Sequence, residues 1–143
     1  MQNNIERLFE MELIYKQGQP PISSADSRLG EYIGSGEGKV TGSRIQGTIR
    51  WDLFETQGEN LCQSNLRGVI ETQDGAQIAF DSLDYFMRTD LSAPNLWTTS
   101  AAVAFETTAE QYTWLDDLLA TLHGEFDMDT YQHRYQVYGM NKE

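Results

Sequence analysis

The sequence predicts an all-β protein, a single antiparallel β-barrel that is closed or nearly closed, with about eight strands and one short helix near the C-terminus. Three observations predict this class. Short runs that alternate apolar and polar residues are separated by glycine, asparagine and aspartate. The chain shows neither a strand–helix–strand rhythm nor an internal repeat. Its 143 residues, of which 39% are hydrophobic, suit one domain over 1–143 with a single core.

The first predicted strand covers residues 5–15 and is followed by a polar segment. Alternation in "IERLFEMELIY" places one set of side chains on the same face of this strand. Residues 17–27, which include two prolines, are expected to form a loop. The side chains expected on the shared face are Ile5, Arg7, Phe9, Met11, Leu13 and Tyr15.

The stretch "GSGEGKVTG" at residues 34–42 resembles a phosphate-binding loop but fails the known motifs. Ile33 stands where the Walker motif needs its first glycine, and Val40 stands where it needs serine or threonine. Glu37 would also place a negative charge among the phosphates. We therefore expect a strand in which the glycines relieve crowding where the barrel bends sharply.

Two further segments have strong strand signals. Residues 43–54 alternate, with Ile45, Ile49 and Trp51 on one face and Arg44 and other polar residues on the opposite face. Residues 66–88 contain two β-rich runs on either side of Asp74-Gly75, a pair that favours a type I′ hairpin turn.

The C-terminal third is expected to hold two strands and the helix. Residues 96–108 form a strand of low bulk, and residues 131–139 form the last alternating strand. Residues 109–122 have leucines spaced for one helix face. Part of this helix, in residues 118–126, could instead be a strand.

Composition excludes several classes of function. Ten basic against 22 acidic side chains give a net charge of −12, which repels nucleic acids and anionic membranes. The chain has no run of 18 apolar residues for a membrane span, and its start lacks the features of a signal peptide, so we expect a cytoplasmic protein. The side chains that could bind a metal are too few for a site. They are the single cysteine, Cys62, the two histidines, His123 and His133, and two nearby aspartates at 127 and 129. We expect no metal and no cofactor.

Charged residues embedded in apolar strands are the candidates for chemistry. Alternate residues of a barrel strand point into its lumen, and a lumen with a few charges among aromatics suits a small organic ligand. The alternative is that these charges face solvent while their apolar neighbours fill the core. The residues in question are Arg50, Asp52, Arg67, Glu71, Tyr85, Arg88 and Glu106.

Each type of side chain suggests a role. An arginine would orient a carboxylate, phenolate or enolate through paired hydrogen bonds. A desolvated Glu106 would have a raised pKa and could act as an acid or base near neutral pH. Flat apolar walls would come from Trp51, Tyr85, Trp97, Tyr112 and Trp114.

The segments "GSGEGKVTGSRIQGTIRW", "RGVIETQDGAQIAF" and "FETTAEQYTWLDDLL", followed by "YQVYG", resemble the bacterial and fungal domain-of-unknown-function family 3237. The resemblance runs from about Leu29 to Gly139. It implies a small antiparallel barrel similar to allene oxide cyclase and dirigent barrels, which guide ring closure or coupling without a cofactor. It also implies pairing through outer strands, and hence a homodimer. The chain departs from the family pattern at residues 50–52 and at Asp84, which replaces a glycine.

These observations lead to one main hypothesis and two alternatives. The main hypothesis is a small-molecule-binding barrel that acts as a cofactor-independent isomerase, cyclase or lyase on an aromatic or polyketide-like ligand. Arg67 would orient the ligand, Glu106 would be the acid or base, and Arg50 or Tyr85 would stabilise negative charge. The alternatives are a lipocalin-like carrier, with lumen space made by Ala101, Ala102 and Ala104, and an interaction module that uses its outer surface. A polar pocket with two ionisable groups within hydrogen-bonding reach would favour the enzyme.

Overall fold

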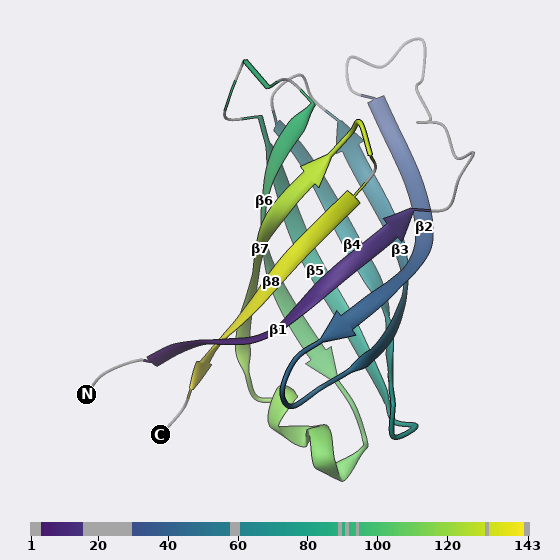
Figure 1. The fold of residues 1–143 in the computed structure, drawn as a ribbon, viewed down its shortest axis with the longest axis vertical. Coiled ribbons are helices and arrows are strands. Elements are labelled where there is room, and N and C mark those ends of the chain that lie inside the picture. Colours follow the sequence, from purple (N-terminus) through teal and green to yellow (C-terminus); the bar gives the residue numbers. More distant parts are fainter. Residues whose placement is uncertain are drawn as a thin grey trace.

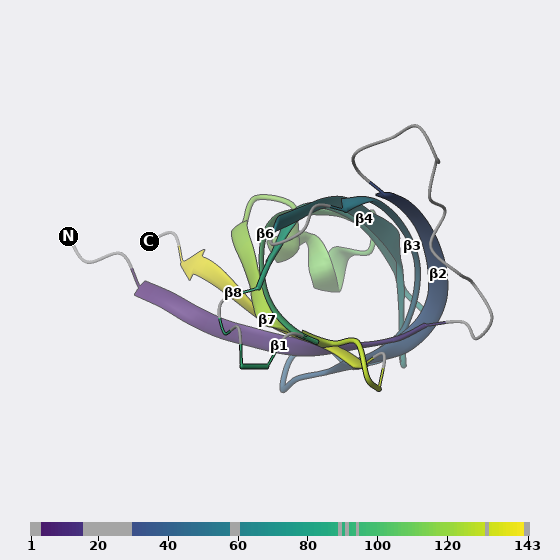
Figure 2. The same cartoon turned by 90° about the horizontal axis from the view of Figure 1, so that it is seen from above.

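The computed structural model describes residues 4–15, 30–57, 61–88, 90, 92–93, 95–130 and 132–141. In this part of the chain, eight antiparallel strands form a closed barrel in which β8 returns to pair with β1 (Figures 1 and 2). The predicted all-β barrel is therefore confirmed. The expected loop over residues 17–27 lies outside the described residues. The strands are β1 (Asn4–Tyr15), β2 (Gly30–Thr41), β3 (Gly47–Gln57), β4 (Leu61–Thr72), β5 (Gln77–Met87), β6 (Leu96–Glu106), β7 (Leu119–Asp127) and β8 (Gln132–Asn141).

Neighbouring strands along the chain pair with each other, so inward and outward positions follow directly from the alternation. In β5 and β6, every second side chain is buried and the others are exposed. We call the end of the barrel where β5 ends and β6 begins the upper end, as in Figure 1. The short helix lies at the lower end.

The start of β1 departs from the predicted pattern. Its pairing with β8 shifts register between Arg7 and Phe9, and Leu8 and Phe9 are both buried. The extra residue of this β-bulge reverses the alternation before it. The expectation that Ile5 and Arg7 share the face of Phe9 is therefore wrong, and Ile5 is 68% exposed.

The glycine-rich stretch forms β2, as expected, and its glycines allow β1 to approach closely. A β-carbon on Gly36 would lie 2.0 Å from the carbonyl oxygen of Ile14, and one on Gly38 would lie 2.0 Å from that of Glu12. Both contacts involve backbone atoms, which cannot move aside without disturbing the strand pairing. The glycines are therefore a packing requirement of the barrel wall.

Gly38→Ala is expected to lower the free energy of unfolding by more than about 2 kcal/mol, because the added methyl group overlaps backbone on β1. Urea unfolding followed by far-ultraviolet circular dichroism measures this loss. Glu37→Ala is the matched control on the same strand, because its side chain is exposed and should change stability by less than about 0.5 kcal/mol. Equal losses in the two variants would contradict the packing argument.

The hairpin between β4 and β5 is where the sequence placed it, but its turn differs from the expected type I′. Gly75 N–H donates to the Thr72 carbonyl over 3.0 Å, and Thr72 N–H donates to the Ala76 carbonyl over 2.9 Å. Gln73 and Asp74 are therefore at the centre of the turn, and Gly75 follows with φ 88°. This is a three-residue hairpin loop that ends in a glycine with positive φ.

The predicted helix is shorter than expected. The 3₁₀-helix η1 covers Glu110–Leu115, and β7 begins soon after it, so the alternative of a strand within residues 118–126 is confirmed. Tyr112 and Leu115 of η1 are buried beneath the barrel. The Tyr112 hydroxyl donates to Asp74 over 2.9 Å, which attaches the helix to the β4–β5 hairpin.

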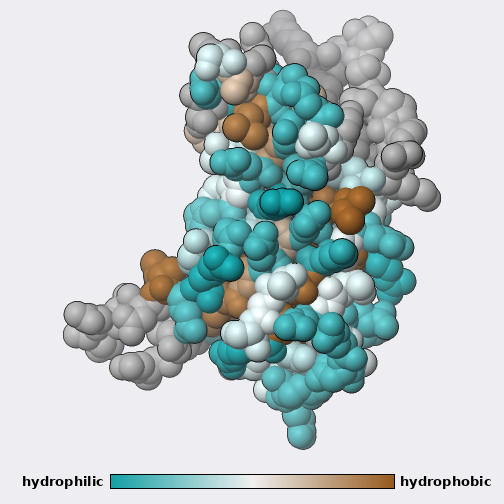
Figure 3. Space-filling view, viewed as in Figure 1, coloured by the Kyte–Doolittle hydropathy of each residue, from teal (hydrophilic) through white to brown (hydrophobic). Residues whose placement is uncertain are grey.

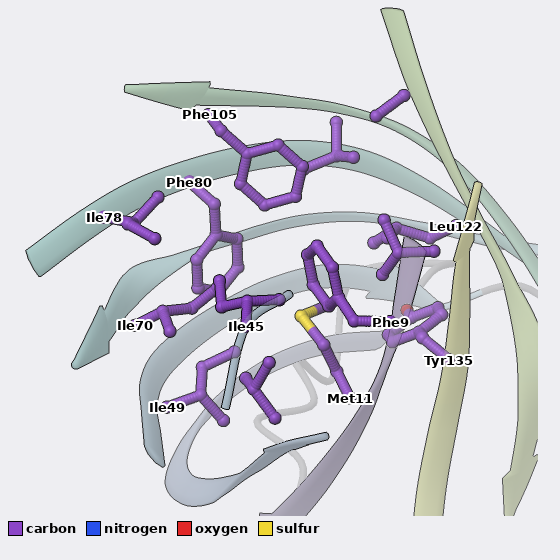
Figure 4. Packing of buried hydrophobic residues seen from close by; sticks show 14 of the residues in the cluster. Phe9, Met11, Ile45, Ile49, Ile70, Ile78, Phe80, Phe105, Leu122 and Tyr135 are labelled. Atoms are coloured by element: carbon purple, nitrogen blue, oxygen red, sulfur yellow. The ribbon is translucent and has the colours of Figure 1, made fainter. Parts of the chain in front are cut away.

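Apolar side chains from all parts of the barrel wall fill the lower half of the interior. Phe9, Ile45, Ile70, Phe80 and Phe105 converge there (Figure 4). The outer surface over β1, β7 and β8 is mostly hydrophilic (Figure 3). Within the described ranges, the structure contains no helix long and apolar enough to span a bilayer.

Candidate functional site

The upper half of the barrel interior contains a group of buried polar side chains. Asp84, His133 and Tyr135 are each completely buried. They come from β5 and β8, and neighbouring hydroxyls come from β4, β5 and β6. We call this group the interior polar cluster. It consists of Ser64, Ser82, Asp84, Thr99, His133 and Tyr135, together with the buried carboxylate of Glu55 on β3, which is in register with Ser64.

Asp84 connects the two sides of the barrel. Its carboxylate accepts a hydrogen bond from the Tyr135 hydroxyl and another, over 2.5 Å, from the Ser82 hydroxyl. Burial raises the pKa of Asp84 from 3.8 to about 6, although both hydrogen bonds act to lower it. A carboxyl group with this pKa can both accept and release a proton near neutral pH.

Tyr135 is expected to stay protonated beside Asp84. Burial, together with the negative charge of Asp84, raises the pKa of Tyr135 well above 10. The phenol is therefore a permanent hydrogen-bond donor toward the carboxylate and holds it in position across the lumen.

His133 is a neutral imidazole in an aromatic environment. Burial lowers its pKa from 6.5 to about 3. Its ring centroid lies 4.1 Å from that of Tyr135 and 5.1 Å from that of Phe86. The Tyr15 hydroxyl lies 3.4 Å from Nδ1. When this hydroxyl donates to Nδ1, the neutral ring carries its proton on Nε2.

Buried polar atoms of the interior polar cluster lack a hydrogen-bond partner in the described part of the chain. Nε2 of His133 and the hydroxyl oxygen of Ser64 are among them. An unpaired buried polar atom costs about 1–3 kcal/mol, so such atoms need a functional or structural explanation. A polar group of a bound molecule would supply the missing partner.

Three predicted site residues lie inside or at the upper end of the barrel. Trp51 is buried, and its ring centroid lies 4.5 Å from that of Tyr15. Trp97 is buried beside Phe86, and the Arg88 guanidinium lies 4.6 Å from the Trp97 ring centroid. The Arg88 Nε atom is buried without a partner among the described residues. An aromatic wall and an arginine therefore lie together at this end.

Most of the other predicted residues lie on the outer surface. Their strands place Trp51, Leu66 and Phe105 inward, so the neighbouring charged residues must point outward. The expectation that these charges line the lumen is wrong, and the alternative that they face solvent is confirmed. The outward residues are Arg50, Asp52, Arg67, Glu71, Tyr85 and Glu106.

Arg67 and Glu106 nevertheless lie near each other on this outer surface. With Asp52, Asp81 and Asp116 they surround an open hollow of about 780 Å³. Glu106 is exposed there, so the desolvation on which its predicted acid–base role depended is absent.

The remaining predicted residues lie at the lower end or outside the lumen. The Tyr112 hydroxyl donates a hydrogen bond to Asp74. Trp114 packs beneath Arg44, whose guanidinium carbon lies 3.7 Å from the centroid of the Trp114 ring. Both are part of the closure of the lower end. Of the alanines expected to create lumen space, Ala101 points inward, whereas Ala102 and Ala104 are exposed.

Sequence reasoning did not assign a role to Asp84, His133 or Tyr135. A signal for Asp84 was present. Ile78, Phe80 and Phe86 define the buried face of β5, and Asp84 lies an even number of positions from each of them, so it points to the same face. The resemblance to family 3237 marked Asp84 only as a departure from a glycine. In the parts of the chain that the structure describes, no group of three or more His, Cys, Asp or Glu side chains could hold a metal ion.

Comparison with known proteins gives the fold alone. No family model matches the chain, so the resemblance to family 3237 is not confirmed, and the curated proteins contain no match. A β-barrel-like protein from Acinetobacter baumannii has a TM-score of 0.85 and 17% identity, covering 99% of this chain and 98% of its own. A protein of unknown function from Clostridium acetobutylicum has a TM-score of 0.82 and 16% identity, covering 99% of each chain. An enzyme from Penicillium herquei has a TM-score of 0.73 and 20% identity, covering 97% of this chain and 95% of its own.

Proposed function

We propose that the protein binds a small organic molecule in the upper half of its barrel and catalyses proton transfer at a carbon next to a carbonyl group. This step occurs in cofactor-independent isomerisation, aldol-type cyclisation and lyase reactions of carbonyl compounds. The observation that carries the proposal is Asp84, a completely buried carboxylate with a pKa of about 6. It lies within hydrogen-bonding reach of Tyr135, whose ring packs against the neutral His133.

The roles follow from the state of each group. Asp84 accepts the proton from the α-carbon, and the electron pair of the broken C–H bond forms an enolate. The Nε2–H of His133 donates to the developing enolate oxygen, and a neutral imidazole can do so without losing its own proton. Tyr135 and Ser82 hold the carboxylate in place. Asp84 then returns the proton to another carbon, which isomerises the substrate, or to the alkoxide formed when the enolate attacks a second carbonyl and closes a ring.

The surroundings support an aromatic or polyketide-like ligand. Trp51, Trp97 and Phe86 offer flat apolar surfaces, which suit ring systems. Arg88 at the upper end can pair with a carboxylate or phenolate at the far end of such a molecule. The enzyme from Penicillium herquei supports catalysis on this type of barrel. The carrier remains the alternative, but two ionisable groups in direct contact favour the enzyme.

The test uses β-tetralone, an enolisable ketone whose ring is fused to benzene, in deuterium oxide, with exchange of its α-protons followed by proton nuclear magnetic resonance. The protein is expected to accelerate exchange at least about tenfold over buffer. Arg67→Ala and Glu106→Gln are the controls, and both should keep the wild-type rate because their side chains lie outside the lumen. If the protein binds anilinonaphthalene sulfonate, an amphiphilic fluorescent probe, but gives no acceleration, the carrier is supported instead.

A further inference from the structure

One region of the outer barrel wall is free of charge. The upper halves of β3, β4, β5 and β6 present twelve outward-facing residues, and none of them is Asp, Glu, Lys, Arg or His. Adjacent members pair directly across the strands, so the region is continuous. We call it the uncharged face, and it consists of Phe54, Thr56, Leu61, Gln63, Asn65, Leu83, Tyr85, Met87, Leu96, Thr98, Ser100 and Ala102.

The lower halves of the same strands are very different. Six of their eleven outward-facing residues are charged, so the lack of charge above them is not a general property of these strands. The charged six are Arg50, Asp52, Arg67, Glu71, Asp81 and Glu106, and the other five are Thr48, Val69, Gln77, Ala79 and Ala104.

The uncharged face also exposes large apolar side chains. Phe54 is 51% exposed, Leu61 53%, Leu83 46% and Met87 49%. Phe54 and Leu83 border a hollow of about 400 Å³ with Gln63 and Asn65 between them. Contiguous apolar exposure of this kind marks a surface that another molecule covers.

The charge of the chain indicates what that molecule is. A basic partner would be recognised by acidic side chains, which this face lacks although the chain has a net charge of −12. A second copy carries the same net negative charge, so contact between two copies meets the least repulsion through a surface without charges. We propose that the protein forms a twofold homodimer through the uncharged face.

The dimensions of the face indicate how strong this contact can be. Four strands at about 4.8 Å spacing and three to four residue pairs at about 6.6 Å give a projected area of roughly 400 Å². This is about half of the roughly 800 Å² per partner of a standard interface, so we expect a weak dimer whose population rises with protein concentration. A closed barrel offers no free strand edge, so the two copies pack side chain against side chain.

Sedimentation velocity of the full chain, from about 1 to about 100 µM, tests the proposal. The wild type is expected to sediment as a dimer of twice 16.3 kDa. Leu83→Glu puts a carboxylate from each copy into the contact, which adds a desolvation cost and repulsion between the acidic copies, and should weaken the dimer at least about tenfold. Phe54→Asp on the neighbouring strand should do the same, and Ala79→Glu, outward on β5 but below the face, should leave the dimer intact. A monomeric wild type at the highest concentration, or equal dimers in Leu83→Glu and Ala79→Glu, would overturn the proposal.

Salt provides a second measurement. Raising NaCl from about 50 to about 500 mM should strengthen the dimer, because salt screens the repulsion between two acidic chains. Weakening by salt would show that opposite charges hold the copies together, and would overturn the uncharged face as the contact. Circular dichroism of Leu83→Glu confirms that the barrel is folded. The proton-transfer activity does not depend on this face, so α-proton exchange by Leu83→Glu should match that of the wild type.

Discussion

Asp84→Asn is expected to slow α-proton exchange by roughly 10²–10⁴-fold, the usual contribution of a positioned general base. Asparagine has the same shape as aspartate but cannot accept the proton. His133 cannot replace the carboxylate, because burial lowers its pKa to about 3 and its free Nε2 is a donor when Tyr15 occupies Nδ1. The rate that remains should reflect binding and the hydrogen bond to the enolate oxygen alone.

The same substitution is expected to leave the barrel at least as stable at neutral pH. Burial raises the pKa of Asp84 from 3.8 to about 6, so holding this carboxylate ionised costs about 3 kcal/mol at pH 7. Asparagine carries no charge and removes that cost. The Ser82 and Tyr135 hydroxyls can rotate to bond its amide. Loss of activity with unchanged or increased stability is typical of a functional residue and not of a structural one.

The measurement compares exchange rate and thermal midpoint in the wild type, Asp84→Asn and Asp81→Asn. Asp81 is the matched control, since it is on the same strand but points outward and accepts a hydrogen bond from Asn65 over 2.7 Å. We expect Asp81→Asn to keep the wild-type rate. Asp84→Asn at the wild-type rate would contradict the acid–base role. A loss of both rate and thermal stability would assign Asp84 to the structure of the barrel instead.

The fold could be predicted because its strongest signals are local. The alternation of β5, the hairpin near Gly75 and the glycines of β2 each depend on a few neighbouring residues. The bulge in β1 could not be predicted, because Leu8 and Phe9 are both apolar and either could point inward. Residues 118–126 contain enough leucine for a helix, and pairing with β6 and β8 decided that they form a strand.

The candidate site was harder to predict because it depends on closure of the barrel. Asp84 and Tyr135 are 51 positions apart, and their contact exists because β5 and β8 lie across the lumen from each other. The charges that stood out in the sequence, such as Arg67 and Glu106, are numerous and face outward. The informative feature was a carboxylate on the apolar face of β5. The alternation of apolar residues along β5 would have identified Asp84 as an inward-facing carboxylate from the sequence alone.

The pH dependence of stability tests Asp84 and His133 together, because burial shifts their pKa values in directions that have opposite effects on stability. The pKa of His133 falls from 6.5 when unfolded to about 3 when folded. Between these values the unfolded chain binds a proton that the folded chain does not. The contribution of His133 to stability is therefore present above pH 6.5 and is lost on acidification, by about 1.4 kcal/mol per pH unit and about 5 kcal/mol in total.

The contribution of Asp84 to stability changes with pH in the opposite direction. Its pKa rises from 3.8 when unfolded to about 6 when folded, so between these values the folded chain binds the extra proton. Stability from this group is fully present below pH 3.8 and is lost as pH rises through about 6, by about 3 kcal/mol in total. Between about pH 4 and about pH 6, the two contributions should nearly cancel in the wild type.

Single variants should remove this cancellation. In Asp84→Asn, stability is expected to fall by about 1.4 kcal/mol for each pH unit below 6.5, because only the His133 contribution remains. In His133→Gln, stability relative to the wild type should rise between about pH 6 and about pH 4. Urea unfolding at each pH measures the differences, in which the exposed carboxylates cancel because all variants share them. Parallel curves for the wild type and both variants would show that neither group titrates as its burial requires. Divergence in the expected directions would place a base with a pKa near 6 beside a permanently neutral imidazole, the pair that the proposed proton transfer needs.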